Sequence, residues 1–206
     1  MVPKNCFANF YFLSILLNLF LYYKERLEIT NLYRVMYITH VLRRLLEQAF
    51  LFTKLPKPSL LHVVGYLFGL WYFYTLIFSY YVATALALNN PSSYYPFGYS
   101  VLLNCFAQFL QFYSHVKLSE LRRDDRDETK IYKVPTAGPF KYVLCPHYVA
   151  EILIYVSVCC NLNMVFCLVF TTVELATLGH SNRKWYRENF AKDRLVTDKA
   201  LVPYIF

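Results

Sequence analysis

Three polar residues recur at helical spacing in a segment that is otherwise apolar. His147, Glu151 and Tyr155 follow Pro146 at intervals of four residues, so they share one face of the helix that begins after this proline. A carboxylate inside a membrane helix costs about 2.5 to 3.5 kcal/mol on insertion scales, so it usually faces a protein interior or a polar cavity. We therefore predict a buried polar site here, in preference to a helix start that faces lipid headgroups.

A second polar stripe lies in an earlier apolar segment. Gln111, His115 and Arg122 are spaced i, i+4, i+11, which places an amide, an imidazole and a guanidinium on one helix face. The charged stretch over residues 119–137 follows, includes Lys133, and leads to the first stripe. Donors inside a pocket with Arg and Lys at its mouth suit a phosphate-bearing cofactor, because guanidinium forks match phosphate oxygens.

The motifs of common soluble nucleotide and metal sites do not occur. There is no G-x-G-x-x-G after a strand pattern and no Walker loop, so any dinucleotide must be held by membrane helices and their loops. The six cysteines include no Cys-x-x-Cys pair, which argues against a zinc site and a disulfide framework. No metal is predicted, and the thiols are interpreted as free packing groups.

The composition indicates the elements that must position these stripes. The 206 residues are 57% hydrophobic and only 17% charged, with a mean hydropathy of +0.32. A soluble domain carries about 25% charge. We therefore predict an all-α, polytopic integral membrane helix bundle. The net charge of +8 is dispersed over loops and helix ends, which suits anionic headgroups or a phosphorylated ligand better than nucleic acid. No obligate protein partner is evident.

About six transmembrane helices are predicted from the length of the apolar runs. Residues 1–206 would form a single domain, with N-terminal helices in 1–58 and the main body in 59–206. The crossings are expected at 5–23, 31–53, 60–88 and 97–118, followed by a helical hairpin over 147–180 whose tip is 161–163.

Basic residues set the predicted orientation. Residues 119–141 hold six Lys or Arg, residues 180–206 hold six more, and the hairpin returns the chain to the same side. By the positive-inside rule this side is cytosolic, so both termini and the pocket mouth face the cytosol. The basic loop at 24–34 would lie on the opposite side, against this rule.

Several motifs resemble those of the steroid 5-alpha-reductase family. The segments Tyr132-Lys-Val-Pro, Gly138-Pro-Phe-Lys-Tyr-Val and Pro146-His-Tyr-Val-Ala-Glu resemble its C-terminal signature, and the last is most similar to the polyprenol reductase branch. His40-Val-Leu-Arg-Arg-Leu-Leu-Glu and the tail Lys199-Ala-Leu-Val-Pro-Tyr-Ile-Phe are similar too. The resemblance covers nearly the whole chain from around residue 35.

The resemblance implies a reductase of the endoplasmic reticulum membrane that uses NADPH. It would saturate the alpha-isoprene double bond of a polyprenol or polyprenal on the route to dolichol, the lipid carrier for protein N-glycosylation. Its partners would be a long-chain polyisoprenoid substrate and membrane lipids. Hydride must reach the beta carbon and a proton the alpha carbon. A conjugated aldehyde delocalises the developing charge onto oxygen, so polyprenal is the hypothesised immediate substrate.

Family roles carry over onto matching positions of this chain. Glu151 is the candidate catalytic residue. The family pattern assigns no proton donor in this chain, and Tyr148 and Tyr155 are the candidates. Gln111 and His115, with His147 and Glu151, would lie toward the nicotinamide-ribose end, whereas Arg122 and Lys133 would serve the phosphates. The full implied cofactor pocket is Arg44, Gln111, His115, Arg122, Tyr132, Lys133, His147, Glu151 and Tyr186.

The chain also departs from the family pattern. Val41 stands at the tyrosine that contacts the enone oxygen in steroid-reducing members, and residues 1–23 contain no glutamate for the second contact, which argues against the alternative of a steroid 3-oxo-5-alpha-reductase. Asn182 replaces a common histidine, and Asp198 stands where the family tends to have Arg. The start is shorter than usual, so a truncated, non-catalytic lipid-binding protein stays an alternative.

Another membrane fold around a nucleotide-like cofactor occurs in the isoprenylcysteine methyltransferases. These enzymes would bind S-adenosylmethionine in place of NADPH, and the cationic mouth favours the phosphorylated cofactor. A scaffold protein, in contrast, would tolerate apolar residues at His147 and Glu151, because the desolvation cost of the buried polar groups would vanish.

Overall fold

Helices form most of the chain that the structure, a computed structural model, describes. The described elements are, in order, β1 (Val2–Pro3), α1 (Ala8–Lys24), α2 (Thr30–Phe50), β2 (Leu60–Leu61), α4 (Phe97–Arg123), the 3-10 turn η2 (Gly138–Lys141), α5 (Pro146–Ser157) and α6 (Leu162–Asn189). The described residues are 2–3, 8–24, 30–51, 60–61, 63–64, 67, 70, 97–123, 134–159, 162–190 and 197–201. They belong to two compact units, Met1–Val101 with Val158–Cys167 and Leu102–Ser157 with Leu168–Phe206.

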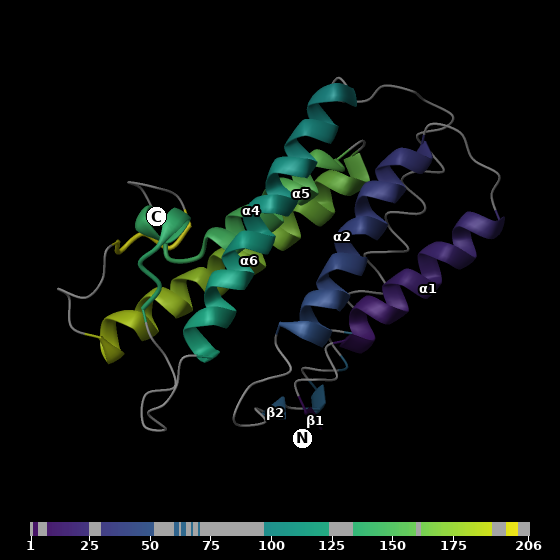
Figure 1. The fold of residues 1–206 in the computed structure, drawn as a ribbon. Helices are drawn as coiled ribbons and strands as arrows, with labels where there is room; N and C mark the ends of the chain where they lie inside the picture. The colour runs from purple at the N-terminus through teal and green to yellow at the C-terminus, as the bar shows by residue number, and fades with distance from the viewer. Residues whose placement is uncertain are drawn as a thin grey trace. The chain divides into compact units, whose positions relative to one another are not determined.

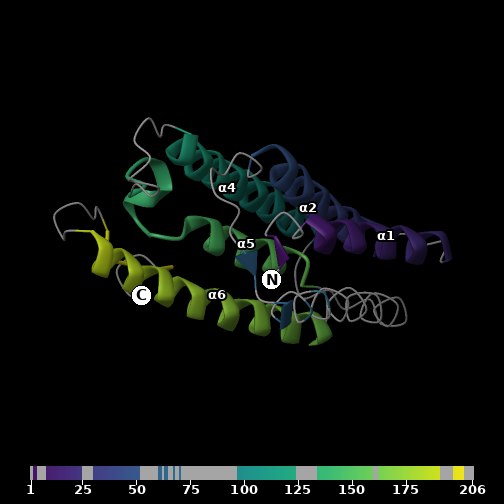
Figure 2. The same cartoon turned by 90° about the horizontal axis from the view of Figure 1, so that it is seen from below.

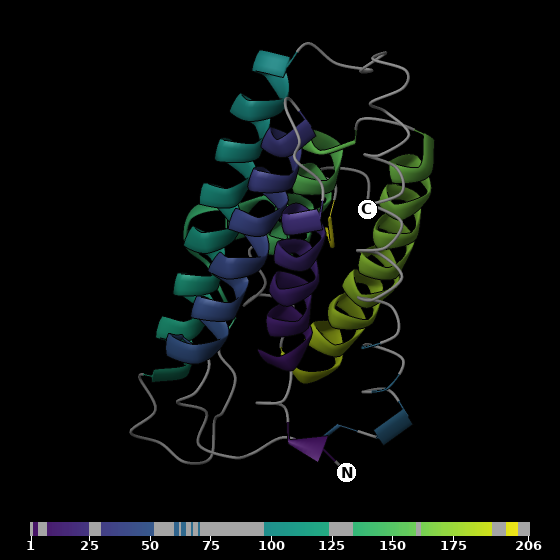
Figure 3. The same ribbon diagram turned by 90° about the vertical axis from the view of Figure 1, so that its right-hand side faces the viewer.

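The first unit contains an antiparallel helix pair. Figures 1 and 3 show α1 and α2 side by side, and Phe10 of α1 and Tyr37 of α2 are buried. Arg44 of α2 reaches across to α1, where it donates to the Tyr11 hydroxyl at 3.2 Å and lies over the Tyr11 ring. The two-residue strands β1 and β2 pair antiparallel, with Val2 opposite Leu61.

A buried ion cluster lies on α2. Glu47 is 2% exposed and accepts hydrogen bonds from Arg43 and Arg44, which lie three and four residues before it on the same helix face. His40 is also buried, and its Nδ1 lies 3.3 Å from Arg43. Two guanidinium groups therefore compensate the one buried carboxylate of this helix.

In the second unit, α5 lies between α4 and α6 (Figure 2). Pro146 starts α5 because a first-turn residue needs no N–H and the fixed φ of proline suits a helix. At the other end of α5, Asn104 Nδ2 donates to Ser157 Oγ at 2.8 Å between two buried side chains. This polar bond joins α4 to the last turn of α5.

The turn that leads into α5 depends on one glycine. Gly138 has a φ of +60°, a conformation that is strained for residues with a Cβ. A Cβ at this position would also lie 2.8 Å from Cε1 of Tyr113 on α4. Gly138 is therefore required for both the turn and its close approach to α4.

The last helix runs further than the sequence predicts. The helix α4 ends at Arg123, which agrees with the expectation that Arg122 lies on it, whereas α6 ends at Asn189, where the helical hairpin was expected to end at residue 180. Arg183, Lys184 and Arg187 therefore lie on the last turns of α6. The reason is tertiary, because Tyr186 on these last turns packs against the buried pair Ala200 and Leu201.

Several predicted elements lie outside the described residues. They are most of the 60–88 crossing, the loop at 89–96 and the charged residues 124–133. Within the described ranges, none of the helices combines the length and the apolar character that a bilayer crossing requires.

Candidate active site

A buried amide and a carboxylate join α4 to α5 where the two polar stripes meet. Gln111 is 2% exposed, and its Nε2 donates to the Glu151 carboxylate and lies 3.4 Å from the backbone oxygen of His147. This contact offsets part of the cost of removing the carboxylate from water. The structure thus brings residues that are 40 positions apart into one site.

Two imidazoles and a phenol continue this site. The ring centroids of His115 and His147 lie 5.6 Å apart, and those of His147 and Tyr148 lie 4.3 Å apart. His115 is 4% exposed, whereas His147 and Tyr148 are half-buried. The site therefore holds four side chains that can donate or accept a proton, next to the Gln111 amide.

Asn182 of α6 holds the phenol in place. Its Nδ2 donates to the Tyr148 hydroxyl oxygen at 3.2 Å and lies 3.6 Å from Cys145 Sγ. Burial raises the pKa of the Cys145 thiol to about 11, although the Asn182 contact lowers it, so this cysteine is a packing group. Asn182, where the resemblance led us to expect a histidine, is therefore hydrogen-bonded to the first turn of α5.

The C-terminal segment, residues 197–201, supports the start of α5. The backbone N–H groups of Leu144 and Cys145 donate to the carbonyl oxygens of Lys199 and Ala200, at 2.7 and 3.0 Å. Leu201 packs into the same buried cluster as Tyr148 and Tyr186. The C-terminal segment therefore fixes the position of the first turn of α5, which carries Tyr148.

An ion pair cluster ties this segment to α6. Arg187 donates to Asp198 through two nitrogens, with Nε at 2.6 Å from Oδ1, and Arg183 donates to Oδ2 at 3.1 Å. The hydrogen bonds from Arg187 and then Arg183 lower the pKa of Asp198 from its ordinary 3.8 to about 2, although partial burial raises it. Asp198, at a position where the resemblance led us to expect an arginine, thus forms an ion-pair clamp with α6.

This clamp should make stability depend on pH. Because the pKa of Asp198 is lower in the folded chain, its contribution is present above about pH 4 and is lost as the pH falls toward 2. The carboxylate is 39% exposed, so solvent screening limits the contribution to less than about 1 kcal/mol. Thermal unfolding of Asp198→Asn and the parent should differ slightly at pH 6 and converge near pH 2. A difference that persists at pH 2 would contradict the assignment.

The remaining predicted residues do not gather at one place. Tyr186 lies on α6 against the C-terminal segment, and Arg44 belongs to the first unit, where it pairs with Glu47. Arg122 lies in the last turn of α4, but its side chain is outside the described part. Tyr132 and Lys133 also lie outside the described residues. Tyr155 is buried on α5, one helical turn beyond Glu151.

Sequence reasoning did not predict two contacts of this site. The Asn182–Tyr148 bond and the Asp198 clamp both join α6 to segments more than ten residues away in sequence. The only signal available was that both positions depart from the family pattern, and a departure does not identify a new partner.

One family model and several curated proteins match the chain. The model of a family described as 3-oxo-5-alpha-steroid 4-dehydrogenase matches residues 57–206, which include all site residues of the second unit. The chain is 32% identical to a polyprenal reductase of Danio rerio over 85% of its length, and 29% identical to polyprenal reductases of Saccharomyces cerevisiae (99%) and Xenopus laevis (100%). It spans 60%, 75% and 78% of these three relatives.

Proposed function

The chain belongs to the 3-oxo-5-alpha-steroid 4-dehydrogenase family, and we propose that it reduces the alpha-isoprene double bond of polyprenal. The proposal is supported by the activity for which its relatives are named and by the Gln111–Glu151 pair beside His115 and His147, which lies within the region that the family model matches. In this proposal residues 1–206 act as one reductase domain on the route to dolichol, and so support protein N-glycosylation.

The cofactor that we propose is NADPH, which when bound supplies the hydride. The site offers a suitable donor and acceptor set for its nicotinamide-ribose end. An amide and a carboxylate match a carboxamide and ribose hydroxyls, and Gln111 and Glu151 are already held against each other. His115 and His147 add ring nitrogens on the same side of the site. Arg122 and Lys133 would serve the phosphates, and Tyr132 and Tyr186 would complete the part of the pocket that the second unit supplies.

We propose that Tyr148 delivers the proton to the alpha carbon. The Asn182 amide donates to its hydroxyl oxygen, and such a bond stabilises the phenolate that forms when the proton leaves. The adjacent His147 ring, at 4.3 Å between centroids, limits the orientations of the phenol. Glu151 positions Gln111 and, through it, the His147 turn.

The proposed setting is the endoplasmic reticulum membrane. Six crossings would place both termini and the cofactor pocket on the cytosolic side, a proposal supported by the apolar runs and the basic segments of the sequence. The long polyisoprenoid tail would then stay in the bilayer while its polar end reaches Tyr148.

The substrate assignment predicts a clear preference. With NADPH, the full chain in lipid nanodiscs should reduce the double bond of polyprenal, whereas polyprenol should not turn over without prior oxidation, because only the aldehyde can delocalise the developing charge. Mass spectrometry of the products distinguishes reduction of the double bond from reduction of the carbonyl.

Other outcomes of the same assay would contradict the proposal. Equal turnover of polyprenol would refute the requirement for a conjugated aldehyde. Turnover of a 3-oxo steroid alone would favour the alternative of a steroid 3-oxo-5-alpha-reductase. NADPH binding without turnover of any substrate would indicate a truncated relative, and binding of S-adenosylmethionine alone would indicate the methyltransferase class.

A further inference from the structure

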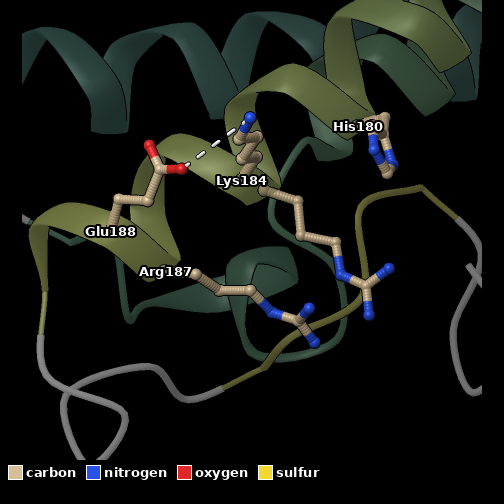
Figure 4. A pocket seen from close by; sticks show the side chains of 5 residues that line it. His180, Lys184, Arg187 and Glu188 are labelled. Atoms are coloured by element: carbon tan, nitrogen blue, oxygen red, sulfur yellow. Dashed lines mark ion pairs between the residues drawn. The ribbon is translucent and has the colours of Figure 1, made fainter.

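A basic cavity opens on the C-terminal half of α6, within the second unit. It has a volume of about 270 Å³ and is lined by His180, Arg183, Lys184, Arg187 and Glu188 (Figure 4). These residues are spaced by three or four positions, so they occupy one face of the helix. No residue of the proposed reductase site lines this cavity.

The charges around this cavity leave an excess of positive charge. Its lining carries three cations, Arg183, Lys184 and Arg187, against the single carboxylate of Glu188. Lys184 and Glu188 are 3.9 Å apart and mostly exposed, so their attraction is weak. Counting Asp198, which binds both arginines, the group still has three cations and two carboxylates.

The Asp198 clamp also prepares the arginines for a ligand. A guanidinium has five donors in a fixed plane, and the clamp uses one from Arg183 and two from Arg187. Each plane is therefore oriented while it keeps further N–H groups. Such preorganised guanidinium groups match the oxygens of a phosphate.

The size of the cavity limits the ligand. Pockets for drug-sized molecules measure about 300 to 1,000 Å³, so this cavity fits a phosphate group better than a whole dinucleotide.

The rest of α6 indicates what the phosphate is attached to. Val169, Phe170 and Val173 are each 47% to 58% exposed and lie on the face of α6 that carries the basic residues. From Val169 to His180, the first residue of the cavity lining, α6 rises about 16 Å at 1.5 Å per residue. This is close to half of the roughly 30 Å hydrocarbon core of a bilayer, the depth of one leaflet.

We propose that this cavity binds the phosphate of an anionic membrane lipid whose acyl chains lie along the exposed apolar residues of α6. Cationic turns directly beyond an apolar helix surface attract anionic headgroups. Trp185, which is 37% exposed among these turns, is a residue type that is enriched at the membrane interface.

The test is lipid binding by the purified full chain in neutral detergent, measured by calorimetry. Dioctanoyl phosphatidic acid should bind at least tenfold more tightly than dioctanoylglycerol, which lacks the phosphate, and also more tightly than inorganic phosphate, which lacks the chains. Lys184→Gln should weaken lipid binding about threefold, the size of one exposed charge contact, and Lys184→Glu should weaken it about tenfold. Lys117→Gln, at an exposed lysine that pairs with Glu120 on α4, should leave it unchanged.

Any of four results would overturn the proposal, and the first three concern the ligands and the variant above. They are equal binding of dioctanoylglycerol, wild-type affinity in Lys184→Glu, and inorganic phosphate binding as tightly as the lipid. Competitive displacement of the lipid by NADPH would also overturn it, because the cavity would then belong to the cofactor. The measurement needs no turnover, so its outcome is independent of the proposed reductase activity.

Discussion

Glu151→Gln is expected to lower kcat/KM for polyprenal by about 10²- to 10³-fold, the loss typical for removal of one preorganised polar group from an active site. The Glu151 carboxylate accepts the Gln111 amide and is the acidic partner in the described site. A glutamine keeps the shape of the side chain but removes its charge. It also replaces one carboxylate oxygen with an NH₂ group, which cannot accept a hydrogen bond from the Gln111 amide.

The measurement is steady-state reduction of polyprenal in nanodiscs, beside Glu120→Gln as the matched control. Glu120 lies on α4, is 51% exposed and pairs with Lys117, so the same chemical change there should leave the rate unaltered. Thermal melting of each variant separates a lost catalytic contact from a lost fold.

A scaffold role gives the opposite result for this pair. If the polar pair has no catalytic function, the double variant Gln111→Leu/Glu151→Leu should still perform the protein's role in cells, and its melting temperature should rise. The reason is that such polar pairs are often neutral or unfavourable for stability relative to apolar packing. The reductase proposal predicts a folded and inactive double variant. The same double variant therefore distinguishes the scaffold hypothesis from the reductase proposal.

Tyr148→Phe is expected to lower kcat by about 10²-fold or more, the usual contribution of a general acid, while KM changes little. Phenylalanine preserves the ring that contacts His147 and removes only the hydroxyl that Asn182 binds. The lost hydrogen bond should cost about 0.5 to 1.5 kcal/mol of stability, which is too little to unfold the chain.

Two further variants make this prediction specific. Tyr155→Phe removes the other candidate hydroxyl from the buried side of α5 and should leave kcat near the parent value. Asn182→Ala should lower kcat and alter its pH profile, whereas Asn182→His, which restores the usual family residue, should recover both if it donates to the same oxygen. If Tyr155→Phe abolishes activity and Tyr148→Phe does not, the proton donor is assigned to the wrong tyrosine.

The sequence alone predicted α4 and α5, the two helices that carry the Gln111–Glu151 pair, and the face on which each polar group of this pair lies. Pro146 marked the first residue of α5, and the four-residue spacing of His147 and Glu151 placed both on one face. The same spacing placed Gln111 and His115 together on α4. These features are local, because helical periodicity and proline geometry act within a few residues.

Only the tertiary structure decided which faces meet. Periodicity does not identify the partner of a helix face, so the contact of Gln111 with Glu151 and that of Asn182 with Tyr148 become visible only when α4, α5 and α6 are packed. The clamp on Asp198 is similar, since nothing in residues 183–187 indicates a carboxylate from the C-terminal segment. The sequence determined which chemical groups each helix offers, and the packing between helices determined which of them form a site, because these contacts join residues 11 to 40 positions apart.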